Sequence, residues 1–187
     1  MIYIIMGVSG TGKTTLGTFL SDKLGWPFHE GDDFHPPENI EKMARGVPLT
    51  DQDRFPWLFR LHEIIKRERC CGSDALVACS ALKRLYRQIL LHGSTVLTPS
   101  STCPRPHVSP PLDVFFIYLL GSYDFIHQRL AARRGHYMKA DLLRSQFDIL
   151  EPPSEEENFL SLDVGRSISD MAGEVEKHVL SLKHQQQ

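Results

Sequence analysis

The chain has 187 residues and a formal net charge of −2. Its length fits one domain with a sizeable core, and its charge excludes the strong positive field typical of proteins that bind nucleic acids or membrane surfaces. No apolar stretch is long enough to span a bilayer, and the four cysteines form no CxxC pair, which favours a reduced, cytoplasmic protein.

Apolar runs alternate with helical patterns along the chain, which predicts an α/β fold: a five-stranded parallel sheet with helices on both faces. We expect one domain over residues 1–183 and a disordered tail over 184–187. The expected strands are Ile2–Met6, Pro27–Glu30, Ala75–Cys79, Val114–Leu119 and Phe159–Asp163. The expected helices are Thr14–Leu24, Pro37–Ala44, Pro56–Arg69, Leu82–Leu91, Tyr123–Arg133, Lys139–Leu150 and Ser169–Leu182.

A glycine-rich motif, GVSGTGKT, follows the first expected strand and opens the first expected helix. This is the pattern GxxxxGK[ST] in its strand–turn–helix setting, so a bare turn without a ligand is the weaker interpretation. The glycines let backbone N–H groups point at phosphate oxygens, while Lys13 reaches the β- and γ-phosphates and the Thr14 hydroxyl can ligate Mg²⁺. The predicted nucleotide-binding residues of this motif are Gly7, Val8, Ser9, Gly10, Thr11, Gly12, Lys13, Thr14 and Thr15.

An acidic segment, EGDDFH, follows the second expected strand. Ligands of open α/β sheets bind at the carboxyl ends of strands. Asp32 could therefore accept a proton from a substrate hydroxyl, Glu30 could hold a Mg²⁺-bound water, and His35 is a candidate substrate contact. The alternative is a solvated turn that caps the next helix.

Basic side chains follow in two places. Arg54 stands before a long expected helix, and its guanidinium suits a carboxylate or phosphate, although a salt bridge to Asp51 or Asp53 is the alternative. Lys83 and Arg87 lie at the start of another expected helix, where positive charge is unfavourable unless an anion compensates. These residues predict an acidic substrate, with a solvated basic helix face as the alternative.

Two later segments interrupt the regular pattern. Residues 94–111 are rich in proline, serine and threonine, and we expect a disordered insertion. The arginine-rich stretch RLAARRGHY suits a closing lid over about residues 129–150, in which Arg129 and Arg133 would stabilise phosphate charge and His136 would contact substrate. A basic surface helix is the alternative.

Several stretches together resemble the gluconokinases, small P-loop kinases close to shikimate kinase and the nucleoside monophosphate kinases. The resemblance spans nearly the whole chain, and the combination of HPPEN, DQDR, PWL and CSALK is specific to that family. It implies a three-layer P-loop kinase fold with a mobile lid. It also implies a homodimer that uses ATP and Mg²⁺ to phosphorylate the 6-hydroxyl of D-gluconate, giving 6-phospho-D-gluconate.

The resemblance also implies roles for individual residues. Asp32 matches the acid that contacts the acceptor hydroxyl, and Glu30 stands where the related kinases have the aspartate of the water-mediated Mg²⁺ site. Arg54 matches the arginine that binds the acceptor's carboxylate in shikimate kinase. Arg129 and Arg133 match lid arginines that touch nucleotide phosphates, and the loop around Val164 should lie near adenine.

Two other functions are weighed against this one. A kinase for another small acid or for a nucleoside monophosphate suits the P-loop and the lid equally, but the PPEN and DQDR segments argue against it. A GTPase-type switch lacks the NKxD motif, and the DxxG pattern at Asp170–Gly173 falls in an expected helix.

Overall fold

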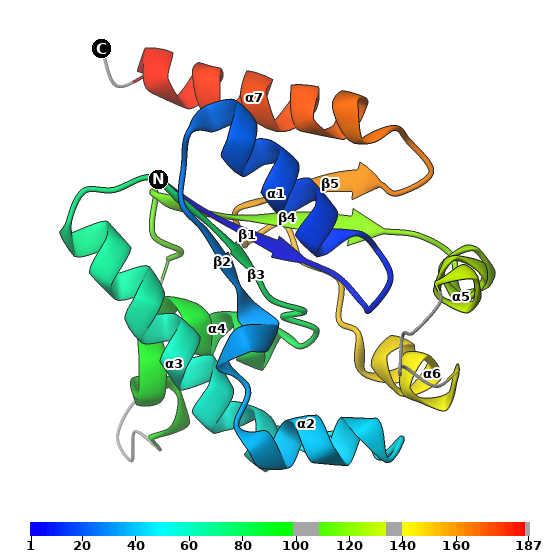
Figure 1. Ribbon diagram of the computed structural model, residues 1–187. Helices are drawn as coiled ribbons and strands as arrows, with labels where there is room; N and C mark the ends of the chain where they lie inside the picture. The colour runs from blue at the N-terminus through cyan, green and yellow to red at the C-terminus, as the bar shows by residue number, and fades with distance from the viewer. Residues whose placement is uncertain (99–108, 134–139, 186–187) are drawn as a thin grey trace.

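The computed structural model describes residues 1–98, 109–133 and 140–185. Its centre is a parallel sheet with the strand order β2-β3-β1-β4-β5 (Figure 1). The strands are β1 (Ile2–Met6), β2 (Phe28–Glu30), β3 (Ala75–Ala78), β4 (Val114–Leu120) and β5 (Phe159–Asp163). The five parallel strands confirm the predicted sheet.

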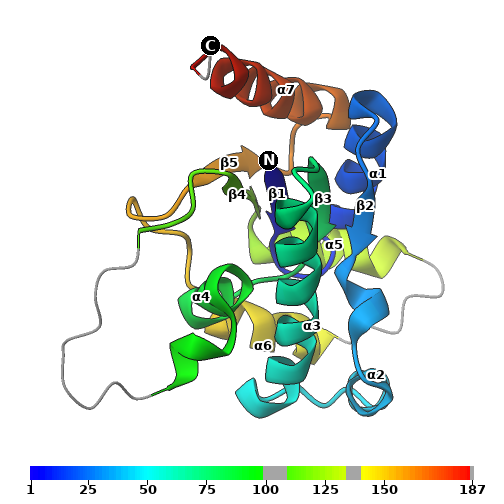
Figure 2. The same ribbon diagram turned by 90° about the vertical axis from the view of Figure 1, so that its left-hand side faces the viewer.

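Helices cover both faces of this sheet. The helices are α1 (Lys13–Leu24), α2 (Pro37–Ala44), α3 (Asp51–Cys70), α4 (Arg84–His92), α5 (Tyr123–Ala132), α6 (Ala140–Ile149) and α7 (Ile168–Gln185). Helices α1 and α7 pack together on one face, and α3 and α4 pack together on the other (Figures 1 and 2). Helices α5 and α6 lie beyond the carboxyl ends of the strands, where an open α/β sheet binds its ligands. No helix within the described ranges is long and apolar enough to cross a membrane.

Strand β1 lies at the centre of the core. All five of its side chains are fully buried, since β3 and β4 flank it and helices cover both of its faces. A strand buried on both faces needs a continuous apolar run, which is what Ile2–Met6 provides. The turn after β1 therefore follows directly on a fully buried strand.

Helix α3 begins five residues earlier than the sequence predicted. Pro56 suggested a first helical position, but Thr50 is the N-cap and forms a capping box with Asp53. Pro56 is accommodated inside the helix. As a consequence Arg54 lies on α3 itself and not in the loop before it, so the helix fixes the direction of its side chain.

Three further segments differ from expectation. Gly31–Phe34 forms a 3₁₀ helix that the sequence did not predict. Gly93–Leu97 forms another, so the start of the expected insertion is structured, and residues 99–108 lie outside the described residues. Gly93 fits closely against α3, because a Cβ there would lie 2.9 Å from His62 Nε2. Helix α7 extends to Gln185 and includes the first two residues of the expected tail.

Candidate active site

The turn after β1 has the shape of a phosphate cradle. Gly10 and Gly12 have φ angles of 82° and 92°, which glycine adopts without the steric cost of a Cβ. Gly12 is the N-cap of α1, and no side chain of the described residues caps that end or places a carboxylate in its first turn. The free N–H groups and the positive end of the helix dipole fit an anion such as the phosphates of ATP.

The side chain of Thr11 supports this turn. Its side chain is buried, and its hydroxyl donates a hydrogen bond of 2.8 Å to the Val8 carbonyl oxygen. Lys13 is held in the same way, since its Nζ donates to the carbonyl oxygens of Gly7 and Val8 at 2.9 and 3.0 Å. Burial lowers the pKa of Lys13, and the nearby carboxylates of Asp32 and Glu30 oppose that shift.

Thr14 and Glu30 bring two oxygen ligands together beside the cradle. The Thr14 hydroxyl donates a hydrogen bond to the Glu30 carboxylate, and both side chains stand at the carboxyl edge of the sheet. Hard oxygen atoms are the ligands that Mg²⁺ prefers, so this pair fits the predicted metal site. Thr15 is exposed on the next position of α1.

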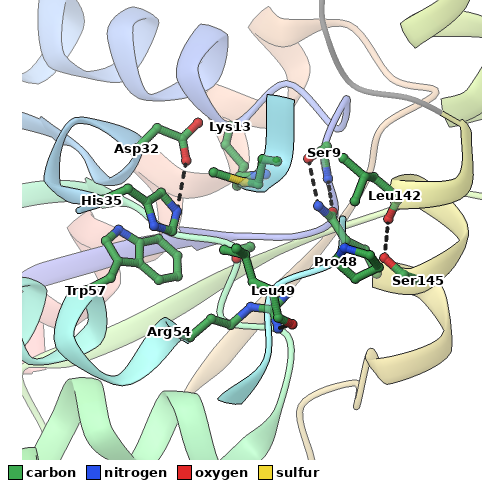
Figure 3. A pocket seen from close by; sticks show the side chains of 13 residues that line it. Ser9, Lys13, Asp32, His35, Pro48, Leu49, Arg54, Trp57, Leu142 and Ser145 are labelled. Carbon is green, nitrogen blue, oxygen red and sulfur yellow. Dashed lines mark hydrogen bonds and ion pairs between the residues drawn. The ribbon is translucent and has the colours of Figure 1, made fainter. Parts of the chain in front are cut away.

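Backbone packing fixes Asp32. A Cβ on Gly31 would lie 2.0 Å from the Ala78 carbonyl oxygen, so only glycine lets the 3₁₀ helix approach β3 this closely. The Gly31 carbonyl oxygen also accepts a 2.7 Å hydrogen bond from the Trp57 indole. The Asp32 side chain is 83% exposed and lines a pocket that also contains Lys13 and Arg54 (Figure 3).

His35 lies between Asp32 and Trp57. Its ring is buried and stacks on Trp57 at a centroid distance of 4.0 Å. Asn39 Nδ2 donates to His35 Nδ1 at 3.2 Å, so the proton of the neutral ring is on Nε2, which is 4.0 Å from Asp32 Oδ1 (Figure 3). Burial lowers the pKa of His35 to about 4, with Asp32 opposing the shift and Arg54 adding to it. His35 is therefore a neutral donor at physiological pH.

Arg54 lies on the wall of the same pocket and is buried. Its guanidinium donates to the Leu49 carbonyl oxygen and, at 3.4 Å, to the Tyr86 hydroxyl. Both partners are neutral. Among the described residues, no carboxylate forms an ion pair with Arg54, so its charge remains available for an anionic ligand.

Lys83 and Arg87 are not brought to this pocket. Lys83 Nζ forms an ion pair of 2.9 Å with Asp51, which also accepts a hydrogen bond from Tyr86. The Arg87 side chain is fully buried and makes two hydrogen bonds to the Glu157 carboxylate, at 2.6 and 3.2 Å. Its remaining bonds, to the carbonyl oxygens of Ala81 and Leu82, fix the loop between β3 and α4.

One residue of the predicted lid, Arg129, lies beside the cradle. Arg129 is exposed on α5 and lies close to Gly12, because a Cβ on Gly12 would be 3.5 Å from Arg129 Nη2. Arg133 is exposed, and its charge contributes to lowering the pKa of Lys13. Val164 is buried after β5, and its backbone N–H bonds the Leu120 carbonyl oxygen at 3.0 Å. His136 lies outside the described residues.

Several pocket residues were not predicted from the sequence. Trp57 was expected to be a core residue only, and it forms the floor beneath His35. Asn39 does not line the pocket but supports His35, and it could have been suspected as a polar residue on the inner side of a short helix, where it is buried. Ser80 belongs to the CSALK segment but was not assigned a role. The remaining pocket residues that were not predicted are Met43, Pro48, Leu49, Leu142, Ser145 and Gln146.

Comparison with known proteins assigns the family. No protein-family model matches the chain. The chain is 50% identical over 179 residues to a "probable gluconokinase" of Xenopus tropicalis, covering 96% of this chain and 93% of that protein. It is 37% identical to the thermosensitive gluconokinase of Escherichia coli K12, covering 97% of this chain and 88% of that protein. The chain belongs to the gluconokinase family.

A solved structure supports the same assignment. The gluconokinase of Sinorhizobium meliloti 1021 matches with a TM-score of 0.79 and 34% identity, over 99% of this chain and 97% of that one. This structural match and the five-stranded parallel sheet confirm the predicted P-loop kinase fold. Membership of the gluconokinase family confirms the predicted enzyme class, a kinase.

Proposed function

We propose that this protein transfers the γ-phosphoryl group of ATP to the 6-hydroxyl of D-gluconate and produces 6-phospho-D-gluconate. One observation carries the proposal: a single pocket combines Lys13, Asp32 and Arg54. These residues are a phosphate-binding cation, a carboxylate that can orient a hydroxyl, and a guanidinium that can bind a carboxylate. Gluconate is a small molecule that carries both a hydroxyl, which Asp32 could orient, and a carboxylate, which Arg54 could bind.

The donor half of the reaction rests on the turn after β1. The N–H groups of this turn and Lys13 would bind the phosphates of ATP, with Arg129 and Arg133 approaching from the proposed lid over residues 129–150. Mg²⁺ would be held by the Thr14 hydroxyl and, through water, by Glu30, and it would supply positive charge that neutralises the phosphates. Val164 remains the proposed neighbour of adenine.

The acceptor half rests on Asp32, His35 and Arg54. Arg54 would bind the gluconate carboxylate and thereby fix the direction in which the substrate lies. Asp32 would accept the hydrogen bond of the 6-hydroxyl and take its proton as the oxygen attacks phosphorus. His35, neutral and with its proton on Nε2, would donate to Asp32 or to a substrate hydroxyl.

The acceptor specificity is tested by measuring turnover of ATP and Mg²⁺ with gluconate, shikimate, AMP or no acceptor. We expect rapid turnover only with gluconate. A gluconate rate no higher than the rate without acceptor would refute the proposal.

The role of Asp32 is tested with Asp32→Asn and Asp32→Ala. Both variants should lower kcat by about a hundredfold or more and leave ATP affinity nearly unchanged, since general-base groups contribute about that factor. Asp33→Asn, in an exposed neighbour on the same 3₁₀ helix, is the matched control. A near-normal kcat in Asp32→Asn would move the base elsewhere.

We also propose, from the family resemblance, that the enzyme is a cytoplasmic homodimer. Light scattering coupled to size-exclusion chromatography tests the dimer, and a mass of one chain at micromolar concentration would contradict it.

A further inference from the structure

Helix α6 is joined to the nucleotide-binding turn by one side chain. Gln146 Oε1 accepts a 2.7 Å hydrogen bond from the Ser9 backbone N–H, and Gln146 Nε2 donates to Ser9 Oγ at 3.1 Å. The pair of bonds fixes the orientation of the amide, because a flipped amide would set its NH₂ group against the Ser9 N–H. The two residues are 137 positions apart in the chain, so the contact is purely a product of the fold.

The contact lines the candidate active site. Ser9 and Gln146 line the same pocket as Lys13 and Asp32. In the view of Figure 3, Ser9 lies on the opposite side of Lys13 from Asp32. The acceptor hydroxyl is expected at Asp32 and the phosphates of ATP at the turn that contains Ser9, so Gln146 contacts the donor side of the pocket.

Helix α6 is held in place by contacts at several points. Leu142 and Leu143 are buried, Phe147 makes an edge contact with Tyr123 of α5, and the Glu151 N–H donates to the Leu82 carbonyl oxygen at 2.8 Å. Gln146 therefore extends from a helix of the proposed lid, here packed against the rest of the molecule, to a turn that bends sharply at Gly10. A side chain in this position can transmit the placement of α6 directly to the turn.

We propose that Gln146 is a positioning residue that holds α6 against Ser9 and keeps water away from the γ-phosphate while the acceptor hydroxyl is in place. This inference rests on the proposed kinase function. Without the contact, water would attack the γ-phosphorus in place of gluconate. The bond to the bridging oxygen would then break, giving ADP and inorganic phosphate and releasing a proton.

The first test measures two products of the same enzyme, 6-phosphogluconate and inorganic phosphate. In Gln146→Ala we expect the ratio of inorganic phosphate to 6-phosphogluconate to rise about tenfold, the factor expected when two ordinary hydrogen bonds are lost. We expect kcat to fall more than the KM for gluconate changes. Asp148→Ala, an exposed position two residues further along α6, is the control and should match the wild type.

The second test needs no substrate and no turnover. Hydrogen–deuterium exchange of the unliganded protein should be faster at the Ser9 amide in Gln146→Ala, because the N–H has lost its acceptor. Gln146→Asn keeps the amide but is one methylene shorter, so it should also raise the ratio of inorganic phosphate to 6-phosphogluconate and speed up exchange at Ser9. This variant replaces Gln146→Ala if the alanine variant does not fold. An unchanged product ratio, or unchanged exchange at Ser9, in a folded variant would overturn the inference.

The two proposals can fail separately. If the wild type does not phosphorylate gluconate, the proposed function fails, and the exchange measurement still tests the contact between Gln146 and Ser9. If gluconate is phosphorylated and both Gln146 variants behave as the wild type, only the role of Gln146 is wrong.

Discussion

Arg54 and Arg87 are both buried arginines near the candidate acceptor pocket, yet their surroundings differ in one decisive respect. Arg87 meets the Glu157 carboxylate in a two-point ion pair and bonds two backbone carbonyl oxygens as well. The described partners of Arg54 are a carbonyl oxygen and a hydroxyl, and none is a carboxylate. The charge of Arg87 is neutralised by an ion pair, whereas Arg54 forms no ion pair with any described residue and remains available for an anionic ligand.

The comparison shows that burial and residue type together do not identify a ligand-binding arginine. A buried charge is costly unless it is paired, so an arginine already paired with a carboxylate has a structural role. Here the structural role is specific, because Arg87 fixes the loop in which Ala81 adopts a φ of 45°. Few non-glycine residues adopt this conformation, and the hydrogen bonds from Arg87 hold it in place.

The largest expected effect comes from breaking the Arg87 pair. Arg87→Met leaves the buried Glu157 carboxylate with a hydrogen bond from the Ser154 N–H but without an opposite charge, and should lower the free energy of unfolding by about 3–5 kcal/mol, measured by denaturant titration. The double variant Arg87→Met with Glu157→Leu should recover most of that loss, since it leaves no unpaired charge.

Arg84 and Glu156 provide the matched control, because they form a similar ion pair that is about half exposed. Arg84→Met should cost about 1 kcal/mol or less. If Arg87→Met had normal stability but a raised KM for gluconate, Arg87 would be a substrate-binding residue and not a structural one.

A smaller effect, on binding instead of folding, is expected at Arg54. Arg54→Ala should raise the KM for gluconate by about tenfold to a hundredfold, the range for a lost hydrogen bond to a charged group, and should change the KM for ATP much less. Arg67→Ala, exposed on the same helix, is the control. Equal changes in both KM values would indicate that Arg54 is structural, like Arg87.

The smallest effect is a pH dependence at His35, which lies beside Arg54. The pKa of His35 is about 4 in the folded protein and near 6.5 in an unfolded chain, so the unfolded state binds the proton first as pH falls. Stability is therefore fully present above about pH 6.5 and decreases toward pH 4. Between pH 7 and 5.5 the wild type should lose about 1 kcal/mol more than His35→Gln, by denaturant titration at each pH.

His184→Gln, at an exposed position near the end of α7, should keep the wild-type slope. An identical slope in His35→Gln and the wild type would mean that folding does not lower the pKa of His35, and would contradict the effect of its burial.

The sequence predicted the sheet well because its three central strands, β1, β3 and β4, are continuous apolar runs that can be recognised without information from distant residues. It also predicted the turn after β1 and the acidic segment, since both depend on residues that are close together in the chain. It misplaced the start of α3 because a proline at a possible first position outweighed the capping box of Thr50 and Asp53.

The sequence could not distinguish Arg54 from Arg87, because the difference lies in a carboxylate 70 positions away. The contact between Gln146 and Ser9 was beyond reach for the same reason: it depends on how α6 packs against the turn. Charge patterns along a chain indicate which residues are available for a site, and the tertiary pairing decides which of them are used.

The stacking of Trp57 on His35 also makes the acceptor pocket observable by spectroscopy. The chain has two tryptophans, and Trp26 lies apart from this pocket, against Tyr3 in the core. Indole emission responds to the groups in contact with the ring, so an acceptor that displaces solvent beside His35 would change the fluorescence of Trp57. A Trp26→Phe protein would carry a single intrinsic reporter at the site where the sugar acid is expected to bind, and binding could be followed without a label and without turnover.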